Sequence, residues 1–367
     1  MGPIARRTPQ LSQRKAVPAQ REAVPASTLG ALAQGLALCV AIAGAASVAG
    51  GYLPLIGAPV IAIVIGVVIA NALDGAAIAK RLRVGTISGY ALRGGIVLLG
   101  LTLDLAEVAR TGGGSLLLLA ITVTSGLGFA LLAGRRLGIG WRTRCLIGIG
   151  TTVCGASAIA ALAPVLRAKT AEIAYAISVI FLFNMLAVVL FPGAGRALGL
   201  SDGGFGLWAG TAINDTSAVV AAGYAFSQAA GTCATIVKLT RTTLIVPLVL
   251  GFGLAMPWLD AGKSAPAGGA SAGGPTLLRR LRASVPVFIL LFLLAALCNS
   301  LGLVGDAAPK VQSVARFVMV VALAAVGLQG HWRGFARAGL RPLALGLGTW
   351  ATVALTSLAV QIWTARL

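Results

Sequence analysis

Long runs of apolar residues dominate the chain from about residue 29 onward. Each run is about 20 residues long, the length that a helix needs to cross the hydrocarbon core of a bilayer. Such runs predict helices, because hydrocarbon offers the backbone no hydrogen-bond partner outside its own segment, whereas a barrel requires short alternating segments. The pattern predicts about eleven membrane-spanning helices, at residues 29–50, 54–72, 86–104, 114–134, 144–165, 171–192, 205–228, 232–257, 284–303, 311–330 and 342–364.

Composition supports a membrane protein. The chain has 367 residues, of which 58% are hydrophobic and 10% are charged. Its mean hydropathy is +0.94. A water-soluble domain of this size could not hide so much apolar surface from solvent. We therefore expect an all-α integral membrane protein.

Basic residues give the chain a formal net charge of +20. They lie in short clusters between apolar runs and not along one polar face, which argues against nucleic-acid binding. Clusters of this kind mark cytoplasmic loops. With a cytoplasmic N-terminus, the clusters at residues 80–83, 135–144, 279–282 and 333–341 all fall on the cytoplasmic side. Arg167 and Lys169 are the exception, so either their turn is very short or segment 144–165 does not fully cross the membrane.

Two stretches lie outside the predicted spans. Residues 1–28 are polar and basic and are expected to form a disordered cytoplasmic arm. Residues 260–278 are rich in Ala, Gly and Pro, which predicts a flexible linker. Residues 29–367 are otherwise expected to form a single transmembrane domain.

Internal similarity indicates a repeat. Residues 100–112 align without gaps on 327–339, and residues 150–161 align on 210–221. The first pair follows the third and the tenth predicted spans, which face opposite ways across the membrane. An inverted repeat, common in secondary transporters, is therefore a natural hypothesis. Chance similarity between Ala- and Gly-rich helices is the alternative.

Small and polar residues interrupt two of the predicted spans. The stretches TTVCGAS at 151–157 and TAINDTS at 211–217 place hydroxyl, amide and glycine residues at mid-membrane depth. Such interruptions persist where they line a cavity or pack on protein. We expect two discontinuous helices that face one another and expose backbone groups to a substrate. The candidate substrate-binding residues in them are Thr151, Thr152, Cys154, Gly155, Ser157, Asn214, Asp215, Thr216 and Ser217.

Asp215 is a carboxylate well inside a predicted span, where it needs a partner or a proton. Lys238 and Arg241 in the next span are three residues apart and therefore share one helix face. If both face the site, two positive charges meet one negative charge, and the excess favours an anionic substrate. The alternative is that both snorkel to the membrane interface. Arg93 could line the same cavity or snorkel to the cytoplasmic face.

Nothing in the sequence indicates a metal or a cofactor. The five cysteines form no C-x-x-C pair and are expected to be free thiols, and the single histidine, His331, is expected in an interfacial loop. No nucleotide-binding P-loop occurs. With nine acidic residues, most of them in loops, the chain offers little from which to build an enzyme active site.

Three motifs in order carry a family resemblance: TTVCGASAIAALAPVLRAK at 151–169, GLWAGTAINDTSAVVAAG at 206–223 and ATIVKLTR at 234–241. From about Leu36 to Leu367 the chain resembles the YeiH-like bacterial inner-membrane proteins, a family named for sulfate export. The resemblance implies a secondary carrier distantly like sodium/proton antiporters and bile-acid-type symporters. It also implies two inverted repeats, crossing discontinuous helices and a small oxyanion or sulfonate substrate. The family also has a His-Asp version of the second motif, and Asn214 here removes that proton carrier.

These observations favour a secondary active transporter, most simply an exporter of a small anion such as sulfate, sulfite or an organosulfonate. Its expected partners are that anion, the lipid bilayer of a bacterial inner membrane, and H⁺ or Na⁺ as candidate coupling ions; a homodimer is a candidate assembly. A cation/proton antiporter that uses Asn214 and Asp215 is the alternative within transport. An integral membrane enzyme is the weaker alternative from another class.

Overall fold

The computed structural model describes residues 26–52, 57–73, 75–248, 251–252, 287–330 and 339–364, and the regular structure in these ranges is helical. Three sequence predictions fall outside the described residues: the linker at 260–278, His331, and residues 1–25 of the predicted arm. Residues 327–339, which align with 100–112, are also mostly outside the described residues.

Helices occupy the predicted apolar runs. Their bounds are α1 Ala26–Tyr52, α2 Gly57–Ala72, α3 Gly75–Arg81, α4 Val84–Gly100, α5 Leu105–Arg136, α6 Trp141–Thr152, α7 Ala156–Leu162, α8 Thr170–Ala197, α9 Asp202–Ala212, α10 Thr216–Phe226, α11 Gln228–Thr243, α14 Val287–Ser300, the 3₁₀ turn η1 Gly305–Ala307, α15 Ala308–Gly327 and α17 Leu340–Trp363. Five described segments are long and apolar enough to cross a membrane: Leu29–Tyr52, Leu105–Arg136, Thr170–Ala197, Gly305–Gly327 and Leu340–Trp363. These confirm an all-helical protein of membrane-spanning character; the count of about eleven spans stays a prediction.

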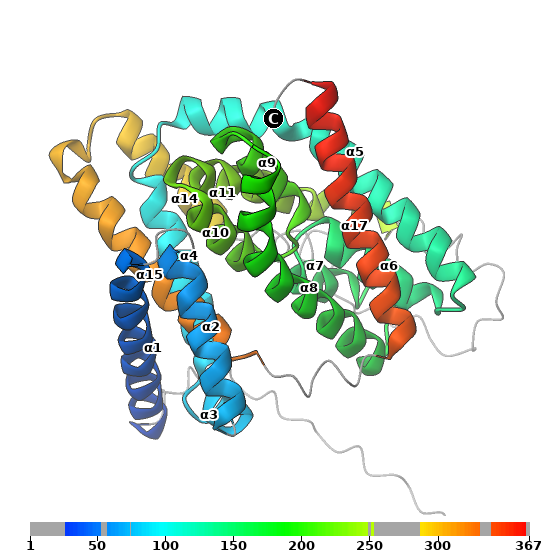
Figure 1. Ribbon diagram of the computed structural model, residues 1–367, viewed down its shortest axis with the longest axis horizontal. Helices are drawn as coiled ribbons and strands as arrows, with labels where there is room; N and C mark the ends of the chain where they lie inside the picture. Colours follow the sequence, from blue (N-terminus) through cyan, green and yellow to red (C-terminus); the bar gives the residue numbers. More distant parts are fainter. Residues whose placement is uncertain are drawn as a thin grey trace, which may run out of the picture.

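The helices form two bundles that lie side by side (Figure 1). The small bundle contains α1, α2, α4, α14 and α15, and the hairpin bundle contains α5 to α11 and α17. Within the small bundle, α2 and α15 approach closely where a Cβ added at Gly327 would lie 3.1 Å from the Cα of Gly66. The two bundles meet mainly where α10 packs on α2 and α15.

The segment predicted as one span at 144–165 is broken and folds back on itself. Helix α6 ends at Thr152, and Gly155 has a φ of +67°, a backbone conformation that favours glycine. Helix α7 then runs back toward the start of α6. A hydrogen bond shows this: Nε of Arg142, in the first turn of α6, donates to the carbonyl of Leu166, beyond α7, at 2.9 Å. We call residues 141–166 the first hairpin.

The segment predicted as one span at 205–228 also folds back. An extended turn at 213–215 separates α9 from α10. The rings of Phe205 in α9 and Phe226 at the end of α10 stack with centroids 4.0 Å apart, so both ends of the segment lie together. Arg196 at the end of α8 donates to the carbonyl of Ala225 at 2.7 Å. Residues 202–226 are the second hairpin.

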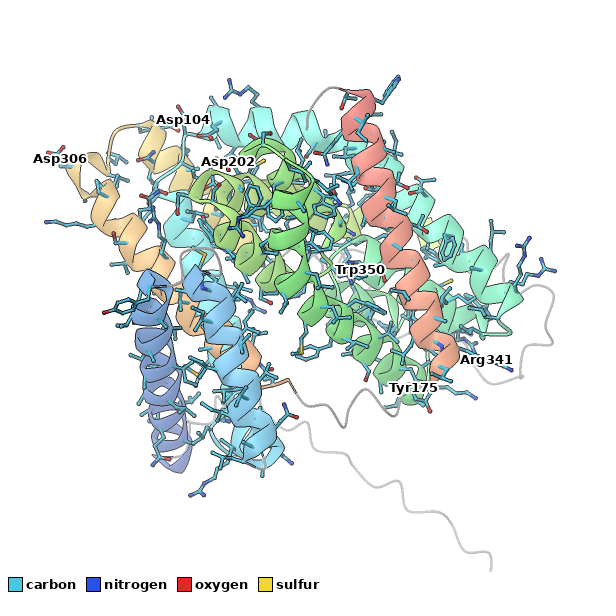
Figure 2. The ribbon with its side chains drawn as sticks, viewed as in Figure 1. Asp104, Tyr175, Asp202, Asp306, Arg341 and Trp350 are labelled. Carbon is cyan, nitrogen blue, oxygen red and sulfur yellow. The ribbon has the colours of Figure 1, made fainter. Side chains whose placement is uncertain are left out.

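The two hairpins enter the bundle from opposite faces. Helix α8, 28 residues long, begins where the first hairpin ends and ends where the second begins. Figure 2 shows Asp104, Asp202 and Asp306 toward one edge of the molecule and Tyr175 and Arg341 toward the opposite edge. The family resemblance implied discontinuous helices that cross; in this chain each one turns back at its break instead.

Candidate functional site

The hairpins meet at their tips. A Cβ added at Gly155, in the turn of the first hairpin, would lie 3.6 Å from both Cβ and Oδ1 of Asp215 in the turn of the second. The sequence prediction of two interrupted helices that face one another is confirmed at these two positions.

Lys238 joins the two tips. Its side chain is fully buried, and its ammonium donates to the carbonyls of Val153 at 2.8 Å, Ile213 at 3.0 Å and Asn214. An ammonium has three donors, so these three carbonyls account for all of them. One carbonyl comes from the first hairpin and two from the second, and Lys238 therefore holds both turns in place.

Arg241 performs the same task one helical turn further along α11. It is fully buried, and it donates to carbonyls of the first hairpin, from Nε to Thr152 and from Nη2 to Thr151 at 2.6 Å. Its Nη1 donates to Thr211 in the second hairpin. These carbonyls belong to the C-terminal ends of α6 and α9, where unpaired acceptors and the helix dipole concentrate negative charge. The guanidinium neutralises both ends at once.

Complete burial excludes the interpretation in which Lys238 and Arg241 snorkel to the membrane interface. Their common helix face is confirmed, since both reach the same pair of turns. Every hydrogen bond described for the two side chains goes to a main-chain carbonyl. Direct contact with an anion stays a prediction, and the geometry favours a role in holding the hairpin tips.

Asp215 caps the second arm of its hairpin. Its Oδ2 accepts hydrogen bonds from the backbone N–H of Ser217 at 3.0 Å and from the Ser217 hydroxyl, as an N-cap residue does. Its own N–H donates to Oδ1 of Asn184 on α8, at 3.0 Å. In the described part of the chain, its hydrogen bonds do not include Lys238 or Arg241.

Asn214 is a buried amide without partners. Its side chain is 1% exposed, and neither Nδ2 nor Oδ1 has a hydrogen-bond partner among the described residues. Leaving such a group unpaired costs about 1–3 kcal/mol. Buried orphan groups of this kind mark places where a ligand, an ion or a water completes the hydrogen bonding.

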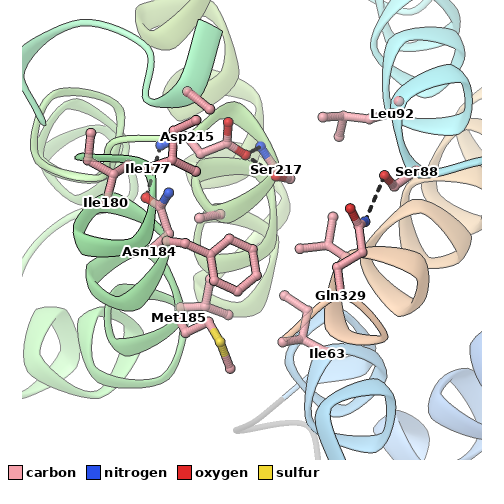
Figure 3. A pocket seen from close by; sticks show the side chains of 16 residues that line it. Ile63, Ser88, Leu92, Ile177, Ile180, Asn184, Met185, Asp215, Ser217 and Gln329 are labelled. Carbon is pink, nitrogen blue, oxygen red and sulfur yellow. Dashed lines mark hydrogen bonds between the residues drawn. The ribbon is translucent and has the colours of Figure 1, made fainter. Parts of the chain in front are cut away.

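Two cavities flank Asp215 between the bundles. One of about 260 Å³ has Asn184, Asp215 and Ser217 on one wall and Ser88 and Gln329 on the other (Figure 3). The second, of about 1050 Å³, is lined among others by Arg93, Cys154, Ser157, Asp215 and Thr216. Asp215 is therefore the acidic residue shared by both cavities.

The predicted site residues divide into two groups. Cys154, Ser157, Asp215, Thr216 and Ser217 line the cavities. Thr151 and Thr152 offer their carbonyls to Arg241, while Gly155 and Asn214 form the turns. Arg93 lines the larger cavity, as one of its two interpretations predicted.

Sequence reasoning missed the far wall of the smaller cavity. There Nε2 of Gln329 donates to the hydroxyl of Ser88 at 3.0 Å, joining the end of α15 to the start of α4. Asn184, whose Oδ1 accepts from the backbone N–H of Asp215, also lines this cavity and was not predicted there. The only signal for Ser88 and Gln329 is that each is a polar residue near the end of an apolar run.

Comparison with known proteins places the chain among membrane proteins. The model of the family described as "Conserved hypothetical protein 698" matches residues 34–346. A UPF0324 membrane protein of Streptococcus pyogenes serotype M6 is 40% identical over 89% of this chain and 96% of the relative. UPF0324 membrane proteins of Clostridium tetani and Streptococcus mutans are 39% and 37% identical, over 74% and 89% of this chain and 79% and 96% of the relatives. No solved structure matches.

Proposed function

Because this chain belongs to the membrane-protein family described as conserved hypothetical protein 698, and because its hairpins converge on a charged site, we propose that it is a secondary active transporter of a small anion. The observation that carries the proposal is the junction of the two hairpin tips at Asp215, with a cavity on either side. A substrate site built from broken helices near the middle of the bundle is the arrangement typical of secondary transporters.

The charges at this junction support an anion. Lys238 and Arg241 cancel the negative ends of α6 and α9, so those ends offer no attraction to a cation. The two helix ends carry about −1 charge together, so of the two buried positive charges about one is left to balance the carboxylate of Asp215. Arg93 then adds a positive group to the larger cavity. The hydroxyl of Thr216 lines the same cavity and supplies a donor, whereas the hydroxyl of Ser157 already donates to the carbonyl of Cys154 at 2.8 Å. The YeiH-like resemblance adds an oxyanion or sulfonate as the substrate class.

The hairpins support an inverted repeat. In the gapless match of residues 150–161 with 210–221, Gly155 aligns with Asp215 and Ser157 with Ser217. The two aligned tip positions, Gly155 and Asp215, are the ones that meet in the structure. We propose that the two hairpins are equivalent elements related by an inverted repeat of their own, inserted from opposite faces of an inner membrane.

Side-specific labelling tests this topology. With both hairpins re-entrant, Arg167 and Lys169 lie on the same face as Arg142, and every basic cluster falls on the cytoplasmic side. In a cysteine-free background, Lys169→Cys is expected to react with a membrane-impermeant maleimide from the cytoplasmic side. Leu198→Cys, at the opposite end of α8, is expected to react in intact cells. If segments 144–165 and 205–228 each crossed the membrane, the two results would be exchanged.

A cation/proton antiporter is the second candidate function. It is favoured by one feature, the buried and unpartnered Oδ1 of Asn214 next to the carboxylate of Asp215. An amide and a carboxylate oxygen together suit a small cation. The two buried cations on α11 argue against it, because they lie beside the same turns.

Ligand binding and flux separate the two candidates. Purified protein is heated with sulfate, sulfite and small sulfonates, each as the salt of the same cation, and with the matching chloride as control. A ligand that binds only the folded state raises the free energy of unfolding by about 2.7 kcal/mol when its concentration is 100 times its Kd. A bound anion should therefore raise Tm, and the rise should grow with the anion concentration. In proteoliposomes, a gradient of the best anion should drive flux. Flux driven by a sodium or proton gradient with no anion requirement would favour the antiporter.

A further inference from the structure

A third cavity, of about 410 Å³, lies toward the opposite face of the bundle interface from the smaller Asp215 cavity. Ser313 and Arg316, near the start of α15, line this third cavity. Val326 and Gln329, at the end of the same helix, line the smaller Asp215 cavity. Because α15 is a single continuous helix, the two cavities open toward opposite ends of it. We call the third one the distal cavity.

The distal cavity offers hydrogen-bond donors and a positive charge, and the described residues that line it include no acidic side chain. Arg316 supplies a guanidinium, and Tyr224 supplies a hydroxyl whose described partner, Thr232 Oγ1, is as far as 3.4 Å away. Gln228 lines the cavity with a buried Nε2 that has no hydrogen-bond partner among the described residues. A guanidinium, a hydroxyl and a free amide N–H are the groups that bind a small oxyanion.

Only a thin apolar layer separates the distal cavity from the Asp215 site. Leu323 lines the distal cavity and Val326 lines the smaller Asp215 cavity, three residues or about 4.5 Å further along α15. On the facing helix α10, Val220 lines the distal cavity and Ala218 lines the other. On both α10 and α15, residues that line the two cavities therefore follow one another within one helical turn.

We propose that the distal cavity is a second anion-binding site, a vestibule on the outer face through which the anion reaches or leaves Asp215. The role as a vestibule rests on the proposed anion transport. The preference for anions rests on the residues that line the distal cavity. Its ligand class is a small oxyanion held by Arg316, Tyr224 and Gln228.

The test measures charge preference without a known substrate. In a cysteine-free background, Ser313→Cys is modified in intact cells by an anionic and by a cationic methanethiosulfonate reagent of similar size. Ser313 and Arg316 are three residues apart on α15 and therefore neighbours. The anionic reagent is expected to react relatively fast, and Arg316→Gln is expected to lower the anionic-to-cationic rate ratio about fivefold, as loss of one nearby partly screened charge predicts. Inorganic sulfate should slow the reaction in the parent and not in the Arg316→Gln variant.

Matched controls separate the cavity from the surrounding surface. Val314→Cys is exposed on the same helix but does not line the cavity, so Arg316→Gln should change its rate ratio much less than that of Ser313→Cys. Arg316→Lys keeps the charge and should keep the ratio. The proposal would be overturned if Arg316→Gln left the anionic-to-cationic rate ratio at Ser313→Cys unchanged. It would also be overturned if Ser313→Cys reacted only from the cytoplasmic side. Failure of anion flux alone would remove the transport function and leave the charge preference of the distal cavity intact.

Discussion

Lys238→Met is expected to leave little folded protein in the membrane. The substitution removes three charge-assisted hydrogen bonds, to Val153, Ile213 and Asn214. It leaves the carbonyls of Val153 and Asn214 without this donor where both hairpins turn, while the carbonyl of Ile213 keeps the longer bond from Arg241 Nη1, at 3.4 Å. Each buried polar group left unpaired costs about 1–3 kcal/mol, so two such carbonyls together cost several kcal/mol. The net stability of a native protein is about 5–15 kcal/mol, so the loss is a large share of it. The measurement is thermal denaturation in detergent together with the yield of monodisperse protein.

Two variants complete this experiment. Lys310→Met removes an exposed lysine near the start of α15. It should change the free energy of unfolding by no more than about 0.5 kcal/mol and so leave Tm nearly unchanged. Lys238→Arg keeps the charge with a different donor geometry and should recover part of the loss. A Lys238→Met protein that is stable but binds the anion about 10- to 150-fold more weakly would instead support direct contact with substrate.

The sequence predicted the positions of the helix breaks but not their geometry. Gly155 and the polar residues around Asp215 marked both interruptions, because such residues are costly in an uninterrupted membrane helix. The return of each second arm was not predicted, since two short apolar arms add up to the same hydropathy as one span. The only hint was the pair Arg167 and Lys169, which broke the charge rule for a crossing segment and satisfies it for a hairpin.

The partners of Lys238 and Arg241 illustrate a second limit. Their spacing placed both on one face, and the structure confirms this. Their acceptors are main-chain carbonyls, which every residue possesses, so no sequence pattern distinguishes a carbonyl freed by a helix break from one inside a helix. The cavity wall formed by Ser88 and Gln329 escaped prediction for a related reason, because it depends on how two bundles meet.

Asp215→Asn is expected to abolish anion flux or to remove the dependence of that flux on pH, while the protein stays folded. Asn and Asp are about equally good N-caps, so the Asn oxygen can still accept from the backbone N–H of Ser217 and preserve the start of α10. The backbone bond from residue 215 to Asn184 is unaffected. What disappears is the one acidic group shared by both cavities at the hairpin tips.

The charge of Asp215 should matter because it is the group that offsets the buried cations beside it. Without it, about one positive charge at the tips is left unbalanced, and an anion that enters would be held too tightly to leave or could no longer couple to a proton. The measurement is flux in proteoliposomes as a function of pH, with Tm as the folding control. Asp202→Asn is the matched variant, since Asp202 is an exposed carboxylate in the first turn of α9 and should transport normally. Normal, pH-dependent flux in Asp215→Asn would exclude the carboxylate from the mechanism and reduce it to a helix cap.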